Sequence, residues 1–285
     1  AIMADYVLTE NGGLHTGTSE RPYIGVNIGE KGVAWRKLRV KGTPGHGSAP
    51  FKSDNALVRA AGVIQRLADY RPPAKFHELW RQQVGILDVD EETKSIMLDT
   101  DRIDDWLDAH PVEGVARHFY SCTHTTFSPN LAESDRQMKT NVIPDQIDIN
   151  VDIRTLPGES TAEVQAHLDS ALGDLADQVE VEIIMNDPAS VSQMDNPLWD
   201  TIQKAVNQPF PSARLSPQFI VGFTDARVYR NLGSVAYGAG LFSPDLKSSD
   251  FMTRFLLTAA AALTAFTAPT LAAPVEYEFD KNHTV

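Results

Sequence analysis

The stretch that decides the fold class is Gln146-Ile-Asp-Ile-Asn-Val-Asp-Ile-Arg-Thr155. Its apolar residues stand at every second position and alternate with charged or amide side chains, which is the pattern of a strand with one buried and one polar face. The capping box Ser160-Thr-Ala-Glu163 follows and predicts the start of a helix. The apolar residues at 164, 168, 172 and 175 share one face of that helix, so we expect a strand followed by an amphipathic helix.

Elements of the same two kinds are expected on both sides of this pair. They are a strand at 34–41, a helix at 55–70, a strand at 117–127 and a strand at 179–185. The helix at 55–70 has apolar residues at 57, 61, 64 and 68 on one face and follows Ser53 and Asp54 as caps. The resulting order, β-α-β-β-α-β, is that of a ferredoxin-like split unit. A segment at 71–114, with Trp80 and Trp106 in expected helices, interrupts it.

Length, composition and charge exclude several classes of protein. The chain has 285 residues, enough for about two domains, and 42% of them are hydrophobic, which excludes a disordered protein. With 25 basic and 38 acidic residues the formal net charge is −13, so neither a nucleic acid nor a membrane is expected as a partner. The single cysteine, Cys122, excludes an intramolecular disulfide and a cysteine-based metal cluster. We therefore expect a soluble protein in a reducing compartment, the cytoplasm.

Both ends of the chain depart from the pattern of a complete domain. Residues 1–9 enter directly into an apolar, strand-like run, and a buried strand needs neighbours on both sides, so we interpret the start as truncated. From Met252 onward, one positive charge, an apolar Ala-rich run and a small-residue ending form a secretory signal pattern at the wrong end of the chain. The alternatives are a helix that packs on a sheet and a foreign sequence joined to the chain. Pro269 and the Ala/Thr content disfavour a membrane span.

Three polar side chains have the chemistry to bind a substrate. His46 lies between Gly45 and Gly47 in a tight turn, from which its ring can reach a carbonyl or an oxyanion. Asn141 lies just before the strand that starts at 146 and can donate from its amide, while the guanidinium of Arg154 suits a carboxylate. For each residue the alternative is structural: a turn residue for His46 and Asn141, and a surface ion pair for Arg154.

Two further candidates follow apolar strands. The segment Gly222-Phe-Thr-Asp-Ala-Arg227 comes after a strand at 218–221 and opens a helix, whose N-terminal amides favour an anionic group. Thr224 within this segment is alternatively a simple N-cap. Glu10 ends the first strand, where a carboxylate is well placed as a metal ligand, although zinc needs three or four ligands.

Taken together, these stretches resemble one family, the co-catalytic zinc peptidases that include aminoacylase, succinyl-diaminopimelate desuccinylase and carboxypeptidase G (peptidase family M20). The resemblance runs from Ala4 to about Asp250. It rests on seven stretches in the family's order, none of which is specific alone: Ala4–Gly13, Glu30–Trp35, Gly42–Ser48, Asp54–Ala56, Thr140–Pro144, Asp152–Gly158 and Thr224–Arg227.

The resemblance implies an α/β fold in two parts. The first is a zinc-peptidase catalytic domain, of which residues 1–30 and 189–250 are the expected remnant. The second is an inserted α+β lid at 31–188, which agrees with the ferredoxin-like order and is expected to form a homodimer. Residues 251–285 remain as the Ala-rich, signal-like tail.

The resemblance also implies a function. The expected activity is the metal-dependent hydrolysis of an amide or peptide bond near a free carboxylate, in a small N-acyl amino acid or peptide, with two zinc ions as cofactors. The loop that holds Gly222 and Thr224 would line the substrate pocket. The alternative is a catalytically inactive dimerisation or binding module derived from the same fold.

The remaining candidates receive roles in the same way. By resemblance, Glu10 is a terminal zinc ligand and Arg154 binds the substrate carboxylate. His46 is the catalytic residue of this chain and, together with Asn141, steadies the oxyanion in the site of the partner subunit.

The metal ligands are where the chain departs from the family. The family's His-x-Asp ligand pair, bridging Asp and Glu-Glu pair all belong upstream of the first residue of this chain, and its last ligand histidine belongs near Phe255. Three look-alikes are not expected to bind metal: His167-Leu-Asp169 on an amphipathic helix, Glu91-Glu92 in the 71–114 segment, and His283. Because tight binding needs several ligands held together, we predict no tight dinuclear zinc site in this chain.

Overall fold

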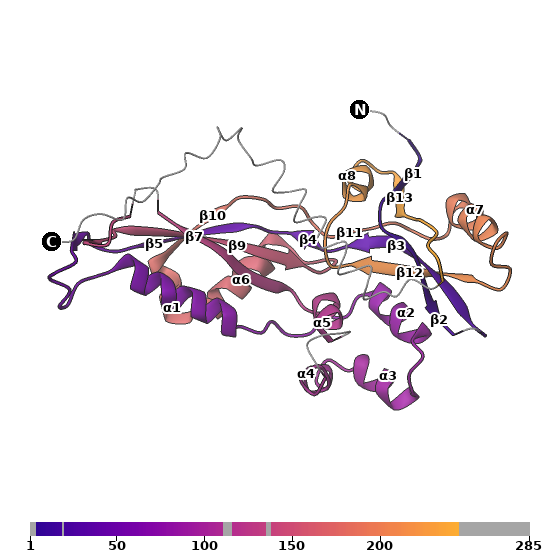
Figure 1. Cartoon of the computed structure of the whole chain (residues 1–285), viewed down its shortest axis with the longest axis horizontal. Coiled ribbons are helices and arrows are strands. Elements are labelled where there is room, and N and C mark those ends of the chain that lie inside the picture. The colour runs from indigo at the N-terminus through magenta and orange to yellow at the C-terminus, as the bar shows by residue number, and fades with distance from the viewer. Residues whose placement is uncertain (1–3, 19, 111–115, 135–137, 245–285) are drawn as a thin grey trace, which may run out of the picture. The chain divides into compact units, whose positions relative to one another are not determined.

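The computed structural model describes residues 4–18, 20–110, 116–134 and 138–244 (Figure 1). The chain divides into one unit at Ala1–Ser243 and a second unit that begins at Pro244. The Ala-rich tail at 251–285, with Phe255 and His283, lies outside the described residues, so the expectations for it stay predictions.

A sheet of five strands carries the predicted β-α-β-β-α-β order. Its elements are β5 (Arg36–Lys41), α1 (Ala56–Asp69), β7 (Thr126–Glu133), β9 (Gln146–Thr155), α6 (Thr161–Leu172) and β10 (Val179–Ile183), with the short β4 (Gly32–Val33) beside β9 and a 3-10 helix at Gly173–Gln178. The four main strands lie in the order β10-β5-β9-β7, and each neighbouring pair is antiparallel. The predicted ferredoxin-like order is therefore confirmed.

The alternation in β9 has the predicted effect on burial. Its four inward-facing side chains are at most 1% exposed, namely Ile147, Ile149, Val151 and Ile153. They pack against Val164, Leu168 and Leu172 of α6. The capping box of α6 also forms, because the Ser160 side chain accepts a hydrogen bond from the Glu163 amide while the Glu163 carboxylate accepts one from the Ser160 amide. Local pattern and tertiary packing agree in this half of the sheet.

The predicted face of α1 is wrong by one position. The buried residues are Ala56, Ala60, Val63 and Leu67, whereas Leu57 is 49% exposed. The N-cap is Asn55, whose side chain accepts from the Leu57 amide, and not Ser53 or Asp54. Apolar residues lie on more than one side of this helix, so the helix pattern alone does not fix which side is buried. The side that packs against the sheet is the one that carries the small side chains of Ala56 and Ala60.

The strand predicted at 117–127 is also wrong. Residues Arg117–Thr123 form helix α5, and the strand β7 begins only at Thr126. The aromatic and threonine residues that favour a strand are used in tertiary contacts instead: Phe119 meets Trp80 edge to face, with ring centroids 5.2 Å apart, and Cys122 is fully buried. Packing of this kind overrides the weak preference of such residues for strands.

A second sheet, of six strands, is formed by segments from both ends of the described chain. Its strands are β1 (Tyr6–Thr9), β2 (Gly12–Gly17), β3 (Pro22–Glu30), β11 (Ser190–Val191), β12 (Arg214–Ile220) and β13 (Val235–Gly238). They lie in the order β1-β13-β3-β11, while β12 pairs parallel and β2 antiparallel with β3. Helices α7 (Pro197–Val206) and α8 (Ala226–Asn231) belong to the same part of the chain. In the described residues β1 pairs only with β13.

The segment that interrupts the ferredoxin-like order folds as helices, as predicted for Trp80 and Trp106. These are α2 (Glu78–Ile86), α3 (Glu91–Met97) and α4 (Ile103–Asp108), followed by α5. Their buried side chains join the cluster of Ile24, Val26, Ile28 and Phe219 in the six-stranded sheet: Leu79, Trp80, Val84, Met97, Ile103, Leu107 and Cys122. The five-stranded sheet has a separate buried cluster. The inserted helices therefore pack against the six-stranded sheet, although in the sequence they lie between β5 and β7 of the five-stranded sheet.

A third, two-stranded ladder joins β6 (Gly45–His46) to β8 (Val142–Ile143). None of the helices in the described ranges has both the length and the apolar content that a membrane span requires.

Candidate functional site

The β6–β8 ladder brings the backbone segments of His46 and Asn141 side by side. His46 pairs with Val142, and the Gly47 amide donates to the Asn141 carbonyl at 2.8 Å. The His46 ring is exposed, and its Nδ1 lies 3.2 Å from the Ser48 amide and 2.7 Å from the Ser48 hydroxyl. Because an amide can only donate, Nδ1 is the acceptor, and the proton of the neutral ring is carried by Nε2. Nε2 is therefore free to donate to a developing oxyanion.

Arg154 is held by a carboxylate on its own strand. Its Nε lies 2.7 Å from Asp152 Oδ1 and its Nη2 lies 3.1 Å from Oδ2, so one edge of the guanidinium is fully used. Trp35 Nε1 donates to the same Asp152 Oδ1 at 2.8 Å. Arg154 Nη1 is buried and has no hydrogen-bond partner among the described residues. The ion-pair alternative is thus realised on one edge of the guanidinium, while Nη1 on the other edge is left without an acceptor among the described residues.

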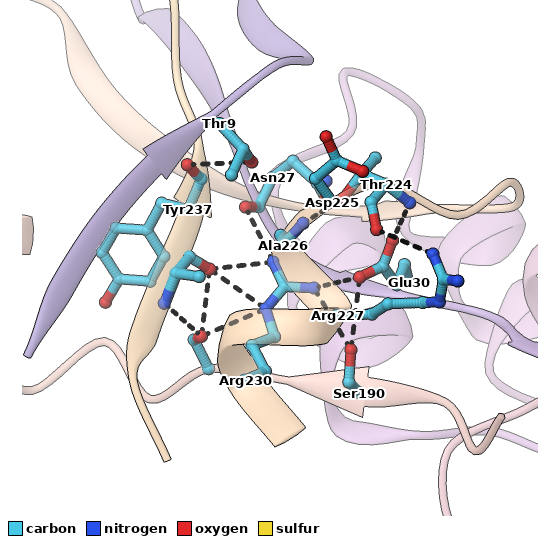
Figure 2. A network of polar contacts seen from close by, with 12 residues as sticks. Thr9, Asn27, Glu30, Ser190, Thr224, Asp225, Ala226, Arg227, Arg230 and Tyr237 are labelled. Carbon is cyan, nitrogen blue, oxygen red and sulfur yellow. Dashed lines mark hydrogen bonds and ion pairs between the residues drawn. The ribbon is translucent and has the colours of Figure 1, made fainter. Parts of the chain in front are cut away.

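The loop from Gly222 to Arg227 starts beside a carboxylate of the chain itself (Figure 2). Thr224 is 4% exposed, and its amide donates to Glu30 Oε2 in a short hydrogen bond. Glu30 Oε1 accepts from Arg230 Nη1 at 2.8 Å and from Ser190 Oγ at 3.3 Å. The anion predicted at this helix start is therefore supplied internally at Thr224, and that amide is not available to a ligand.

Glu30 and Arg230 are the residues that sequence reasoning missed. Both are buried, and burial raises the pKa of the Glu30 carboxyl although Arg230 acts in the opposite direction. Burial likewise lowers the pKa of Arg230. Glu30 lies in one of the stretches that carry the family resemblance, but nothing in the local sequence indicates its partner 200 residues away.

Glu10 also meets this loop, since its Oε1 accepts from the Asp225 amide at 3.2 Å. The side chain is exposed, as a ligand of an incoming metal should be. Across the described part of the chain, however, no three or more His, Cys, Asp or Glu side chains lie close enough to hold a metal ion. A single carboxylate does not make a zinc site. The donor set described here therefore does not fit the two zinc ions that the resemblance implies.

The two look-alike motifs within the described residues have structural partners. His167 Nδ1 lies 2.7 Å from the Tyr70 hydroxyl, and its other nitrogen lies 3.9 Å from Glu159. Glu91 pairs with Lys94 at 2.9 Å in the first turn of α3. Neither motif gathers further metal-ligating groups.

A buried amine near Arg154 was not anticipated. Lys31 is 1% exposed, and its Nζ donates to the His124 carbonyl at 2.6 Å. Burial lowers the pKa of Lys31 to about 7, and the Arg154 charge adds to this effect while Cys122 and Glu159 oppose it. Lys31 lies in the connection from β3 to β4, and His124 lies just before β7. The hydrogen bond therefore links two segments through which the chain enters the five-stranded sheet.

The chain is similar to known proteins over most of its length. A family model described as a peptidase dimerisation domain matches residues 28–180, more than half of the chain. A probable carboxypeptidase S-like 2 of Dictyostelium discoideum is 27% identical over 219 residues, which cover 74% of this chain and 40% of that protein. The N-fatty-acyl-amino acid synthase/hydrolase PM20D1 of Mus musculus is 25% identical over 224 residues, which cover 76% of this chain and 43% of that protein. The chain thus spans less than half the length of the curated relatives it matches.

Solved structures show the same fold. The M20 family metallo-carboxypeptidase Sso-CP2 of Sulfolobus solfataricus superimposes with a TM-score of 0.53 at 18% identity, over 83% of this chain and 55% of that one. Human carnosine dipeptidase 1 gives the same TM-score at 14% identity, over 82% of this chain and 53% of that one. At these identities the likeness concerns the fold alone. The match of the peptidase dimerisation domain at residues 28–180 shows that this chain belongs to the M20 peptidase family and carries its dimerisation domain.

Proposed function

We propose that this chain contributes the carboxylate-binding, oxyanion-binding and dimerisation residues of a metal-dependent M20 hydrolase that cleaves an amide or peptide bond near a free carboxylate. The substrate would be a small N-acyl amino acid or peptide. Support for this class comes from the relatives, which are described as a carboxypeptidase-like protein and as an N-fatty-acyl-amino acid synthase/hydrolase.

One chain of contacts carries the proposal. The guanidinium carbon of Arg154 lies 4.8 Å from the ring centroid of Phe223, in the loop that also holds Gly222 and Thr224. In the same loop, two residues after Phe223, the Asp225 amide donates a hydrogen bond to Glu10 Oε1. Four of the six candidates therefore lie along one continuous set of contacts. His46 and Asn141 form a separate pair, which fits their proposed action on the partner subunit's site.

The chemistry of these residues divides in the following way. Arg154 would grip the substrate carboxylate with its free donors, an interaction made before and during the reaction. His46 Nε2 would donate to the oxygen that becomes negative in the transition state, with Asn141 as a second donor. The described residues do not form a zinc site, so we assign them no step that passes through a metal.

Steady-state kinetics of amine release from an N-acyl amino acid, with zinc and in a fusion of this chain to the metal-ligating segments of an M20 relative, test these roles, because the described residues do not supply a zinc site. We expect His46→Ala to lower kcat by about 10²-fold, because its contact is made in the transition state. Arg154→Lys should mainly raise KM, because a point charge replaces a planar fork. If both variants keep the wild-type kcat and KM, the assignment of roles is wrong.

The second candidate, a non-catalytic dimerisation or binding module, is favoured by one observation: the ferredoxin-like unit is fully formed, whereas the described residues offer no metal cluster. Zinc stoichiometry by equilibrium dialysis and mass in solution by light scattering separate the two. A dimer that binds N-acyl amino acids without zinc and without amine release would favour the module. Zinc-dependent release that is lost in Glu10→Gln would favour the hydrolase.

A further inference from the structure

Phe223 belongs to neither of the two buried hydrophobic clusters found among the described residues. It lies in the loop between β12 and α8, and its side chain is 37% exposed, so it adds little to the buried core. Two guanidinium groups lie against its ring. The centroid is 4.8 Å from the guanidinium carbon of Arg154 and 4.5 Å from that of Arg227. Both distances are within the range of cation–π attraction.

Each of the two cations is neutralised by its own carboxylate. Arg154 is paired with Asp152 through Nε and Nη2, and Arg227 Nε lies 3.0 Å from Asp187 Oδ2. Arg227 Nη1 also lies 3.4 Å from the Thr224 carbonyl, which closes the loop onto itself. Since each pair is close to neutral, the two arginines can share one ring without strong repulsion. The loop is thereby held to two acidic anchors on different segments.

The ring also accounts for the Arg154 nitrogen that has no hydrogen-bond partner. Nη1 is out of contact with water and has no acceptor among the described residues. The face of the Phe223 ring carries negative charge density and attracts a cation at this distance, 4.8 Å from the guanidinium carbon. With Nε and Nη2 bound to Asp152 and the guanidinium carbon 4.8 Å from the centre of the Phe223 ring, the position of the Arg154 side chain is restricted from two sides.

We infer that Phe223 is a positioning residue for carboxylate binding, which orients the guanidinium of Arg154 through its aromatic face. This inference rests on the proposed function, because Arg154 must be the group that binds the substrate carboxylate. The contact joins a loop of the six-stranded sheet to strand β9 of the five-stranded sheet. Phe223 therefore couples the loop from Gly222 to Arg227 to the dimerisation domain at Arg154, the residue proposed to bind the substrate carboxylate.

Binding of N-acetylglycine and of N-acetylglycinamide, which lacks the free carboxylate, to the full chain tests the inference. The ratio of the two affinities, measured by calorimetry or ligand-observed NMR, isolates the contribution of the carboxylate. We expect the ratio to be lost in Arg154→Met and to fall about fivefold in Phe223→Leu, the equivalent of one cation–π contact. Phe223→Tyr keeps the aromatic face and should stay within about twofold of wild type. Phe51→Leu, which removes an exposed phenylalanine with no arginine against it, is the matched control.

The outcomes separate this inference from the proposed function. If Arg154→Met keeps the ratio, or if wild type has none, Arg154 is not the carboxylate ligand and both fall. If Arg154→Met loses the ratio while Phe223→Leu keeps or exceeds it, only the role of Phe223 falls. The Nε–Hε NMR signals of Arg154 and Arg227 give a readout without ligand. Loss of the ring current should move both signals in Phe223→Leu but not in Phe51→Leu, and unmoved signals would overturn the inference.

Discussion

Glu30 and Arg230 lie 200 residues apart in the sequence and form an ion pair in which neither side chain is more than 3% exposed. Figure 2 shows how the pair links β3, β11 and the loop before α8. Ser190 donates to the same carboxylate oxygen as Arg230, and the Thr224 amide donates to the other. Arg230 also donates through Nη2 to the Ala236 carbonyl at 2.9 Å. The loop from Gly222 to Arg227 is thus anchored by a charge pair in the interior of the protein.

Breaking this pair should be costly, because the remaining charge would be buried without compensation. We expect Glu30→Gln to lower the free energy of unfolding by about 3–5 kcal/mol, measured by urea denaturation. The matched control is Asp108→Asn, which breaks the exposed Arg71–Asp108 pair and should cost less than about 1 kcal/mol. Equal losses in the two variants would mean that the Glu30–Arg230 pair is no more important than a surface pair.

Lys31 should make stability depend on pH in an unusual direction. Burial lowers its pKa from 10.5 to about 7, so at pH 7 to 9 the unfolded chain binds a proton at Lys31 that the folded chain gives up. The free energy of unfolding therefore rises with pH, by roughly 1 kcal/mol for each pH unit in that window. The measurement is the urea midpoint at pH 7, 8 and 9 in wild type and Lys31→Met. The slope should be shallower in Lys31→Met and unchanged in Lys204→Met, at an exposed position of α7.

Two leucines test which face of α1 is buried. Leu67 is 1% exposed and Leu57 is 49% exposed on the same helix. We expect Leu67→Ala to destabilise the protein by about 2–5 kcal/mol and Leu57→Ala by no more than about 0.5 kcal/mol. Thermal or urea unfolding of the two variants measures the difference. The reverse order would place the face predicted from sequence, at positions 57, 61, 64 and 68, in the core.

Gly12 is required by a close approach of two backbone segments. Its φ is +125°, and a Cβ added there would lie 2.2 Å from the Gly238 carbonyl oxygen. We expect Gly12→Ala to destabilise the protein by more than about 1 kcal/mol, through strain at this crossing beside Glu10. Gly85, in helix α2, meets nothing within 4 Å, and Gly85→Ala should stabilise by about 0.5–1 kcal/mol. Opposite signs in urea denaturation are the expected result.

The candidate site residues could be named because they lie in short sequence stretches, but their roles stay predictions. His46 and Asn141 were expected to act together, and the β6–β8 ladder brings them together. The contacts of Arg154 could not be predicted. Its carboxylate partner is two residues away, but its aromatic partner, Phe223, comes from a different sheet. The hydrogen-bond donors of a guanidinium that remain free depend on all of its neighbours. Of the two neighbours of Arg154 named above, only Asp152 lies near it in the sequence.

Local sequence patterns are enough to predict the kind and order of most elements in the ferredoxin-like unit. Alternation in β9 and the capping box of α6 are local properties, and burial follows them directly. Packing between distant segments sets three other features: the buried face of α1, the helix at Arg117–Thr123 and the pairing of Glu30 with Arg230. The physical reason is the range of the interactions. A repeat of two or 3.6 residues is set by the backbone, whereas a buried face or a buried charge is stabilised by whichever distant segment packs against it.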